Sequence, residues 1–262
     1  MPSQSPTETD VELWYAWTGA LSDAALWQRY LDLLPPGEIE RIYRFAREPD
    51  RRRGLMACAL TRAALARHTG VEPAAMRFTR DRLGKPELVD PPRTGLSFNI
   101  SHTGELVLCG VSRAGSVGVD VERHDRKLND LALARRFFAP DEAAALEAVP
   151  PAGRRRAFFE LWTLKEAYVK ACGRGLSMPL NHFAIAFGEG QSPTVRFTAP
   201  GYGDPARWRF AQIELAGTYQ AAVALCSAGR GPMTIRLRET LPLVREATPQ
   251  DLPPNPGGRW QI

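Results

Sequence analysis

The feature that most constrains this chain is the stretch of residues 158–176, FFELWTLKEAYVKACGRGL, which contains no proline and no glycine before Gly173. Its apolar residues recur at steps of three and four along two lines, so the pattern predicts a helix with apolar side chains on two sides. Such a helix is typical of a position buried between layers rather than on the surface. Gly173 and Gly175 predict where the helix ends.

Three charged residues of this predicted helix, Lys165, Glu166 and Lys170, admit two interpretations. The simpler one is an ion pair between Glu166 and Lys170, which are four residues apart and share a helix face. The other is a site for a polyanion and a metal ion, because charges on a buried helix need partners. The helix alone favours the ion pair, whereas the rest of the chain favours the ligand site.

Composition limits the class of protein. With 262 residues, of which 44% are hydrophobic and 24% charged, the chain is typical of a soluble globular protein with one large domain or two average ones. No run of 18 apolar residues predicts a membrane span, and the polar N-terminus lacks the apolar core of a signal peptide, so we expect a cytoplasmic protein. The four cysteines are widely spaced and form no CxxC pair, which argues against a zinc knuckle or a disulfide framework.

The net charge of +5 favours an anionic partner without identifying its kind. Arginines cluster at 51–53, 135–136 and 154–156, and no signature of a nucleic-acid-binding module accompanies them. The first cluster falls in the first turn of a helix predicted over 50–69, where a helix already carries partial positive charge. A bound phosphate would stabilise an arginine there, although we expect most of these side chains to reach water instead.

The predicted elements follow a similar order in both halves of the chain. Helices are predicted at 22–33, 38–45, 50–69, 128–138, from 139–142 onward, and at 158–176. Strands are predicted at 12–18, 96–101, 106–111, 117–122, 183–187, 194–198, 208–215 and 219–227. The repeated layout of a strand, a long helix and further strands predicts an α+β fold of two similar subdomains with pseudo-twofold symmetry.

The predicted boundaries are a disordered leader at 1–11, an N-terminal subdomain at 12–114, a C-terminal subdomain at 115–228 and a tail at 229–262. Prolines recur along the tail, so we expect it to wrap loosely or to be partly disordered.

The strand predicted at 117–122 places Asp120 and Glu122 on one face. Two neighbouring carboxylates repel each other, and they are tolerated where a cation lies between them or where both reach water. Together with Glu166 they supply three oxygen donors without a histidine or a thiolate, a set that suits Mg²⁺ better than Zn²⁺. Lys165 and Lys170 add the positive charge that phosphoryl transfer needs, although no P-loop or kinase signature occurs.

Four motifs occur in the chain: GKP at 84–86, FNISH at 98–102, GVDVE at 118–122 and WTLKEAYVKACGRGL at 162–176. With these motifs, in this order, the chain resembles the Sfp-type 4′-phosphopantetheinyl transferases over roughly residues 12–226. The resemblance implies two similar α+β subdomains with the active site in the cleft between them. It also implies transfer of phosphopantetheine from coenzyme A to a serine of an acyl or peptidyl carrier protein, with release of adenosine 3′,5′-bisphosphate.

The resemblance also implies a role for each site residue. Asp120, Glu122 and Glu166 would hold Mg²⁺ against the pyrophosphate, and the catalytic set would be Asp120, Glu166 and Lys170. Lys170 would contact the phosphate under attack, with assistance from Lys165. Whether Glu166 or a metal-bound water is the general base stays open, and so does the question of whether Glu122 is an essential ligand.

Further residues would bind coenzyme A by the same resemblance. The implied phosphate ligands are Arg53, Ser101 and His102, with Arg41 as a further candidate. The implied border of the adenine and ribose is formed by Gly84, Lys85 and Pro86. Glu38 departs from the family pattern, because relatives often have a basic residue at this position, and its contact is therefore in doubt.

The resemblance implies a carrier protein that presents an acidic helix beside the modified serine. We expect a monomer with no nucleic-acid and no membrane partner, and the sequence does not identify the carrier or its pathway. The alternative is a nonenzymatic basic α+β module that binds an anionic partner such as nucleic acid. That alternative explains the net charge but not three carboxylates, which would repel phosphate without a metal.

Overall fold

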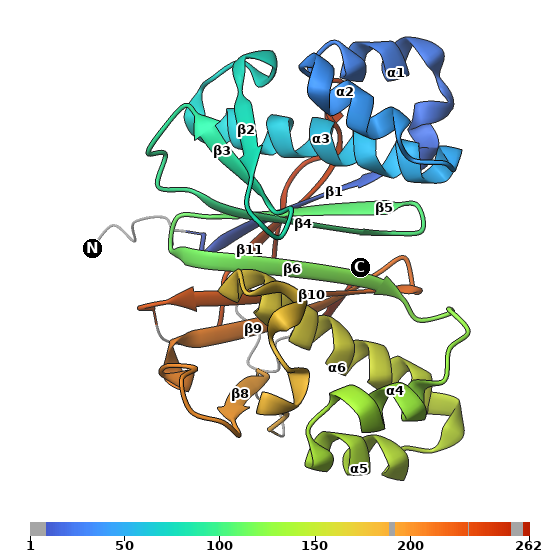
Figure 1. Cartoon of the computed structure of the whole chain (residues 1–262), viewed down its shortest axis with the longest axis vertical. Helices are drawn as coiled ribbons and strands as arrows, with labels where there is room; N and C mark the ends of the chain where they lie inside the picture. The colour runs from blue at the N-terminus through green and yellow to red at the C-terminus, as the bar shows by residue number, and fades with distance from the viewer. Residues whose placement is uncertain (1–8, 189–191, 230, 253–258) are drawn as a thin grey trace, which may run out of the picture.

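The computed structural model describes residues 9–188, 192–229, 231–252 and 259–262. Two sheets lie in the middle of the molecule, and a group of helices covers the outer face of each (Figure 1). The inner faces of the sheets pack against each other through aliphatic side chains such as Leu13, Leu108, Val119 and Val223. The prediction of an α+β fold is confirmed.

The first sheet has the strand order β12-β11-β1-β5-β4, with β13 paired to β11. Its strands are β1 (Val11–Trp17), β4 (Ser97–Thr103), β5 (Leu106–Ser112), β11 (Ile235–Leu241), β12 (Arg245–Glu246) and β13 (Gln250–Leu252). The second sheet has the order β14-β9-β10-β6. Its strands are β6 (Gly115–Arg123), β9 (Trp208–Leu215), β10 (Tyr219–Ser227) and β14 (Arg259–Gln261).

The helices and two small hairpins complete the fold. The first sheet is covered by α1 (Ala24–Leu31), α2 (Pro36–Tyr43) and α3 (Glu48–Thr69), and the second by α4 (Asp130–Phe137), α5 (Pro140–Ala148) and α6 (Pro151–Cys172). The hairpins are β2 (Arg77–Arg80) with β3 (Pro86–Asp90), and β7 (Phe183–Ala186) with β8 (Thr194–Phe197). Trp14 and Leu60 belong to the apolar core beneath α3, and Phe158 and Phe210 to the core beneath α6.

The two halves repeat one order of elements: a strand, three helices, a hairpin and two long strands. The three strands of the first half lie in the first sheet in the order β1-β5-β4. Their counterparts in the second half lie in the second sheet in the equivalent order, β6-β10-β9. This repetition is the pseudo-twofold relation that the sequence layout predicts. The boundary at 114/115 stays a prediction, and β5 and β6 meet there in a short turn.

Helix α6 begins earlier than the sequence analysis expects. The prediction treats Pro150 to Gly153 as a separator, whereas the helix starts at Pro151 and includes the arginines at 154–156. Proline is well accepted in the first turn of a helix, since its missing N–H would have no partner there. The predicted end is confirmed, because Gly173 caps the helix with a left-handed φ of 66°.

The two chain ends also differ from expectation. Residues 1–8 lie outside the described part, but Asp10 and Val11 of the predicted leader belong to the fold, and Asp10 pairs with Arg209 at 2.6 Å. Loose wrapping is wrong for the described part of the tail, because β11 pairs in parallel with β1. Ile235 and Leu237 alternate with arginine and are buried, which is a strand pattern that the neighbouring prolines obscured.

Across the described ranges, no helix combines the length and the apolar character that crossing a membrane would require.

Candidate active site

The site begins with a close contact between β6 and α6. A Cβ atom added to Gly118 would lie 2.1 Å from the carbonyl oxygen of Ala167, so only glycine allows the helix to approach the strand this closely. Asp120 follows on the same face of β6, because side chains two apart in a strand share a face. The contact therefore brings the carboxylate of β6 against the C-terminal half of α6.

Asp120, Ser101 and Lys170 form one hydrogen-bonded cluster. Lys170 Nζ donates to Asp120 Oδ1 at 2.6 Å and to Ser101 Oγ at 3.0 Å, and Ser101 Oγ donates to Asp120 Oδ1 at 2.8 Å. Asp120 is buried, and its second oxygen, Oδ2, has no hydrogen-bond partner. Lys170 thus pairs with Asp120 rather than with Glu166, so the simple i,i+4 ion pair on the helix is not formed.

Glu166 and Glu122 differ in how their charges are compensated. Within the described part of the chain, Glu166 makes no hydrogen bond and no ion pair. Burial raises the pKa of Glu166, the negative charges of Asp120 and Glu122 raise it further, and Lys170 opposes them. Glu122 is held by Arg126, whose Nη1 donates to Glu122 Oε2 at 2.7 Å, and by a hydrogen bond of 3.2 Å from Thr103.

The predicted metal ligands do not form a preformed cage. No group of three or more His, Cys, Asp or Glu side chains is arranged to hold a metal ion in the ranges that the structure describes. The unpartnered Oδ2 of buried Asp120 and the unpaired carboxylate of Glu166 nevertheless fit a hard cation. Magnesium commonly takes only one or two protein carboxylates and completes its shell with water and phosphate oxygens.

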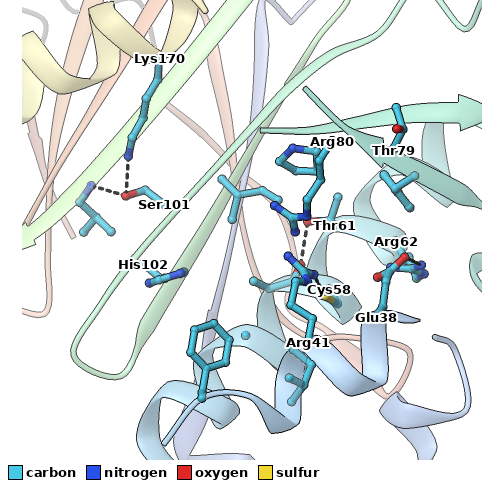
Figure 2. A pocket seen from close by; sticks show the side chains of 18 of the residues that line it. Glu38, Arg41, Cys58, Thr61, Arg62, Thr79, Arg80, Ser101, His102 and Lys170 are labelled. Carbon is cyan, nitrogen blue, oxygen red and sulfur yellow. Dashed lines mark hydrogen bonds and ion pairs between the residues drawn. The ribbon is translucent and has the colours of Figure 1, made fainter. Parts of the chain in front are cut away.

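A cavity of about 690 Å³ opens beside this cluster and is called the larger cavity below, because it exceeds the adjoining cavity of about 280 Å³. It is lined from both halves of the chain: by α2 and α3, by β2, by β4 and β6, and by Lys170 of α6. In Figure 2, Lys170 and Ser101 lie on one side of it and Glu38 and Arg62 on the other. A polyanion placed in it would meet the ammonium of Lys170 beside a buried carboxylate.

Comparison with known proteins identifies the family of this arrangement. Residues 116–224 match the model of the 4′-phosphopantetheinyl transferase superfamily, and residues 16–113 match the model of the N-terminal part of 4′-phosphopantetheinyl transferase. The 4′-phosphopantetheinyl transferase HetI of Nostoc sp. is 35% identical over 76% of this chain and 81% of its own length. This chain belongs to the 4′-phosphopantetheinyl transferase superfamily.

A second relative is the 4′-phosphopantetheinyl transferase Sfp of Bacillus subtilis, which is 32% identical over 60% of this chain and 68% of its own length. The Sfp-type resemblance that the four motifs carry is therefore confirmed.

The structure of this transferase distributes the predicted ligands over three neighbouring cavities. The larger cavity is lined by Arg41, Pro86, Ser101, His102, Asp120, Glu122 and Lys170. A smaller cavity of about 280 Å³ is lined by Gly84, Lys85, Pro86 and Lys170, among others. An open crevice of about 790 Å³ is lined by Arg53 and His102 together with Arg47, Arg123 and Arg126. The GKP turn, the FNISH strand and the end of α6 thus adjoin one another.

Lys165 is not brought into this group. Its side chain is fully buried, and its Nζ donates to Glu142 Oε2 at 2.6 Å and to the carbonyl oxygen of Phe183 at 2.7 Å. Burial lowers the pKa of Lys165 to about 8, against the opposing charge of Glu142. The expected assistance at the phosphate is therefore replaced by a structural role, because the side chain leaves α6 on the side away from Asp120.

Arg53 and His102 lie together, as the resemblance implies, but Arg53 already has partners. It pairs with Asp50 and donates to the carbonyl oxygen of Gly104 at 3.0 Å. Desolvation and then the positive charge of Arg53 lower the pKa of His102. Both side chains border the open crevice, which is also lined by three further arginines and by Asp125.

The sequence analysis missed a pair at the far side of the larger cavity. Arg62 is 1% exposed and donates from Nη2 and Nη1 to the two carboxylate oxygens of Glu38, at 2.8 and 3.1 Å. Glu38 is therefore tied to an arginine, which accounts for an acid at this position. The available signal was Arg62 itself, a charge within the apolar run ALTRAALA.

Proposed function

We propose that the chain transfers the 4′-phosphopantetheine group of coenzyme A to a serine of an acyl or peptidyl carrier protein. The observation that carries the proposal is the position of Lys170, at the border of the two cavities and in contact with Asp120, whose other oxygen has no partner. The family assignment supports this activity over a nonenzymatic basic module.

The reaction is a displacement at phosphorus. The serine oxygen forms a bond to the phosphorus that carries pantetheine, and the bond from that phosphorus to the bridging pyrophosphate oxygen breaks. Adenosine 3′,5′-bisphosphate leaves with the electron pair, and the serine proton passes to a base. Positioning and charge neutralisation supply most of the rate enhancement in reactions of this kind.

Lys170 would neutralise charge on the phosphate under attack. A phosphate oxygen would replace Asp120 as its acceptor, and Ser101 Oγ would remain beside both groups. Asp120 and Glu166 would hold Mg²⁺, joined by Glu122 once Arg126 releases it. When bound, Mg²⁺ would neutralise pyrophosphate charge and improve the leaving group.

Glu166 is one candidate for the base that takes the serine proton. Burial and the neighbouring carboxylates raise the pKa of Glu166, which makes it a better proton acceptor than an ordinary glutamate. A carboxylate that binds Mg²⁺ becomes a weaker base, and a water molecule is then the other candidate.

We place the nucleotide of coenzyme A in the larger cavity. Of the GKP turn, which the resemblance sets at the border of the adenine and ribose, Pro86 lines this cavity, whereas Gly84 and Lys85 line only the smaller one. Arg41, Arg80 and His102 line it and would meet phosphate oxygens, while Pro86 separates it from the smaller cavity. The net charge of +5 complements a carrier protein with an acidic helix, and we propose that the enzyme acts as a monomer.

The test is labelling of a panel of apo carrier proteins with fluorescent coenzyme A, with Mg²⁺ and then with a chelator. We expect covalent label on the serine of at least one fatty-acid, polyketide or nonribosomal-peptide carrier, with loss of labelling on chelation. Folded protein that labels none of the carriers at any Mg²⁺ concentration would contradict the proposal.

A further inference from the structure

The smaller cavity adjoins the larger one and has a different character. It lies between the β2–β3 turn, strand β4 and the end of α6, and its apolar walls include Leu83, Phe98 and Ile100. Its volume of about 280 Å³ is close to the lower end of the range for small-molecule sites. Pro86, Ile100 and Lys170 line both cavities, so the two spaces adjoin at these three residues.

A substrate whose reacting phosphate contacts Lys170 would extend from it into both spaces. In coenzyme A, the phosphorus under attack carries the nucleotide leaving group on one side and the pantetheine arm on the other. The larger cavity provides Arg41 and Arg80, which suit the charged nucleotide. The smaller cavity is mainly apolar, which suits the neutral arm with its two amides.

Strand β4 meets β6 through side chains, although the two strands belong to different sheets. Three alternate β4 side chains accept hydrogen bonds from β6 backbone N–H groups: Ser97 from Val117 at 3.0 Å, Asn99 from Val119 at 3.0 Å and Ser101 from Val121 at 3.3 Å. A backbone N–H only donates, so it is the carbonyl oxygen of the Asn99 side chain that faces β6. The amide nitrogen of Asn99 must point the other way.

The amide nitrogen of Asn99 is a donor without an acceptor. The residue is 7% exposed and lines the smaller cavity, and Nδ2 makes no hydrogen bond within the part of the chain that the structure describes. Nδ2 is not itself fully enclosed, so it reaches the cavity surface, where a ligand oxygen would accept its hydrogen bond. The contact with Val119 holds the donor in one orientation before any ligand arrives.

We propose that the smaller cavity receives the pantetheine arm and that Asn99 Nδ2 donates a hydrogen bond to an amide carbonyl oxygen of that arm. This inference rests on the proposed function, because it takes coenzyme A as the substrate. Asn99 is then a specificity-determining residue, which favours an arm with a carbonyl group at the right distance from the phosphate.

The test compares two ligands and two variants by isothermal titration calorimetry. Coenzyme A has the arm, and adenosine 3′,5′-bisphosphate lacks it. Asn99→Ser keeps a neutral acceptor for the Val119 N–H, as Ser97 and Ser101 do for their partners, but removes the amide donor. We expect Asn99→Ser to weaken coenzyme A binding about tenfold, the effect of one buried hydrogen bond, and to leave adenosine 3′,5′-bisphosphate binding unchanged.

Ser97→Ala is the matched control, because it removes a neighbouring contact with β6 at a residue that does not line the smaller cavity. It should change neither dissociation constant. If Asn99→Ser weakened both ligands equally, or neither, Asn99 would have only a structural role and the proposal would be overturned. The two proposals fail in different experiments. If the proposed function is wrong, the carrier proteins stay unlabelled, whereas the position of the arm is tested by these binding measurements alone.

A second variant keeps the test informative if Asn99→Ser does not fold. Leu83 is 47% exposed on the β2–β3 turn, so Leu83→Ala leaves the core intact. Loss of this apolar wall should weaken coenzyme A binding several-fold and leave adenosine 3′,5′-bisphosphate binding unchanged. Equal affinities of wild type and Leu83→Ala for coenzyme A would place the arm elsewhere.

Discussion

The long helices α3 and α6 are counterparts in the two halves, and they differ in what their buried cations do. Each has 22 residues, a proline in its first turn and a left-handed glycine at its end. The fifteenth residue is a buried cation in both, Arg62 in α3 and Lys165 in α6. Each pairs with the third residue of the preceding helix, Glu38 in α2 or Glu142 in α5.

The likeness extends to the hairpin that follows each helix. The Arg62 guanidinium lies 4.8 Å from the ring centre of Phe78 in β2, and the Lys165 ammonium lies 4.2 Å from that of Phe183 in β7. The Arg62 pair nevertheless lines the larger cavity, whereas the Lys165 pair is enclosed in the core. Equivalent positions in the two halves therefore share a buried ion pair, but only the pair in the first half borders a cavity.

The largest expected effect is the loss of stability when the cation of each pair, Arg62 or Lys165, is replaced by methionine. Lys165→Met leaves a charged Glu142 in the core, and we expect the free energy of unfolding to fall by about 3–5 kcal/mol. Arg62→Met should cost less stability, because Glu38 is partly open to water, and should raise the KM for coenzyme A. Urea denaturation and steady-state kinetics measure the two effects.

The double variant Lys165→Met with Glu142→Gln is the control for this comparison. It should recover much of the lost stability, because the unpaired charge is gone. The contrast between the halves would be refuted if Arg62→Met destabilised the protein as strongly as Lys165→Met and left the KM unchanged.

A second comparison uses the twentieth residue of each helix, Lys170 in α6 and Arg67 in α3. Lys170 contacts buried Asp120, whereas Arg67 pairs with Glu246 at the surface. Lys170→Ala should lower kcat/KM roughly 100-fold or more, by about 3 kcal/mol, because it removes a charge beside the reacting phosphate. Arg67→Ala should change it less than about twofold. Equal losses in the two variants would remove Lys170 from the reaction.

The smallest effect is a dependence of stability on pH that only the α6 pair should show. The pKa of Lys165 is lowered by burial from 10.5 to about 8, so the unfolded chain binds more protons than the folded chain between these values. The free energy of unfolding of the wild type, relative to that of Lys165→Met, should therefore rise from pH 8 to pH 10, by up to about 3 kcal/mol. Arginine keeps its charge throughout this range, so the α3 pair contributes no such slope. If the difference in free energy of unfolding between the wild type and Lys165→Met stayed constant from pH 8 to pH 10, the pKa of Lys165 would not be lowered by folding.

The sequence predicts much of the fold because the long elements have strong periodic patterns. The helices at 50–69 and 158–176 and the strands around GVDVE are found close to their predicted places. Strand β11 was missed, since pairing between distant segments depends on the whole fold rather than on local pattern. The strands β2 and β3 on either side of the GKP turn were missed because each is short.

The candidate site was predictable where motif and geometry agree. Glu166 and Lys170 are four residues apart and share a face of α6, next to Asp120. Lys165 and Lys170 are five residues apart, which separates them by about 140° around a helix, so one ligand cannot face both. The pairs of Arg62 with Glu38 and of Lys165 with Glu142 depend on contacts between helices, and a single sequence does not reveal these.

The contact between β4 and β6 is a polar contribution to how the two halves are aligned. Backbone hydrogen bonds between neighbouring strands form with almost any side chain. The contact between β4 and β6 instead needs the short polar side chains of Ser97, Asn99 and Ser101 as acceptors. These three side chains therefore contribute to the alignment of the halves, in addition to the apolar packing between the two sheets. A recombinant enzyme that joined the first half of this chain to the second half of a relative would bring the three acceptors of β4 with it, and the second half would need to supply only backbone N–H groups.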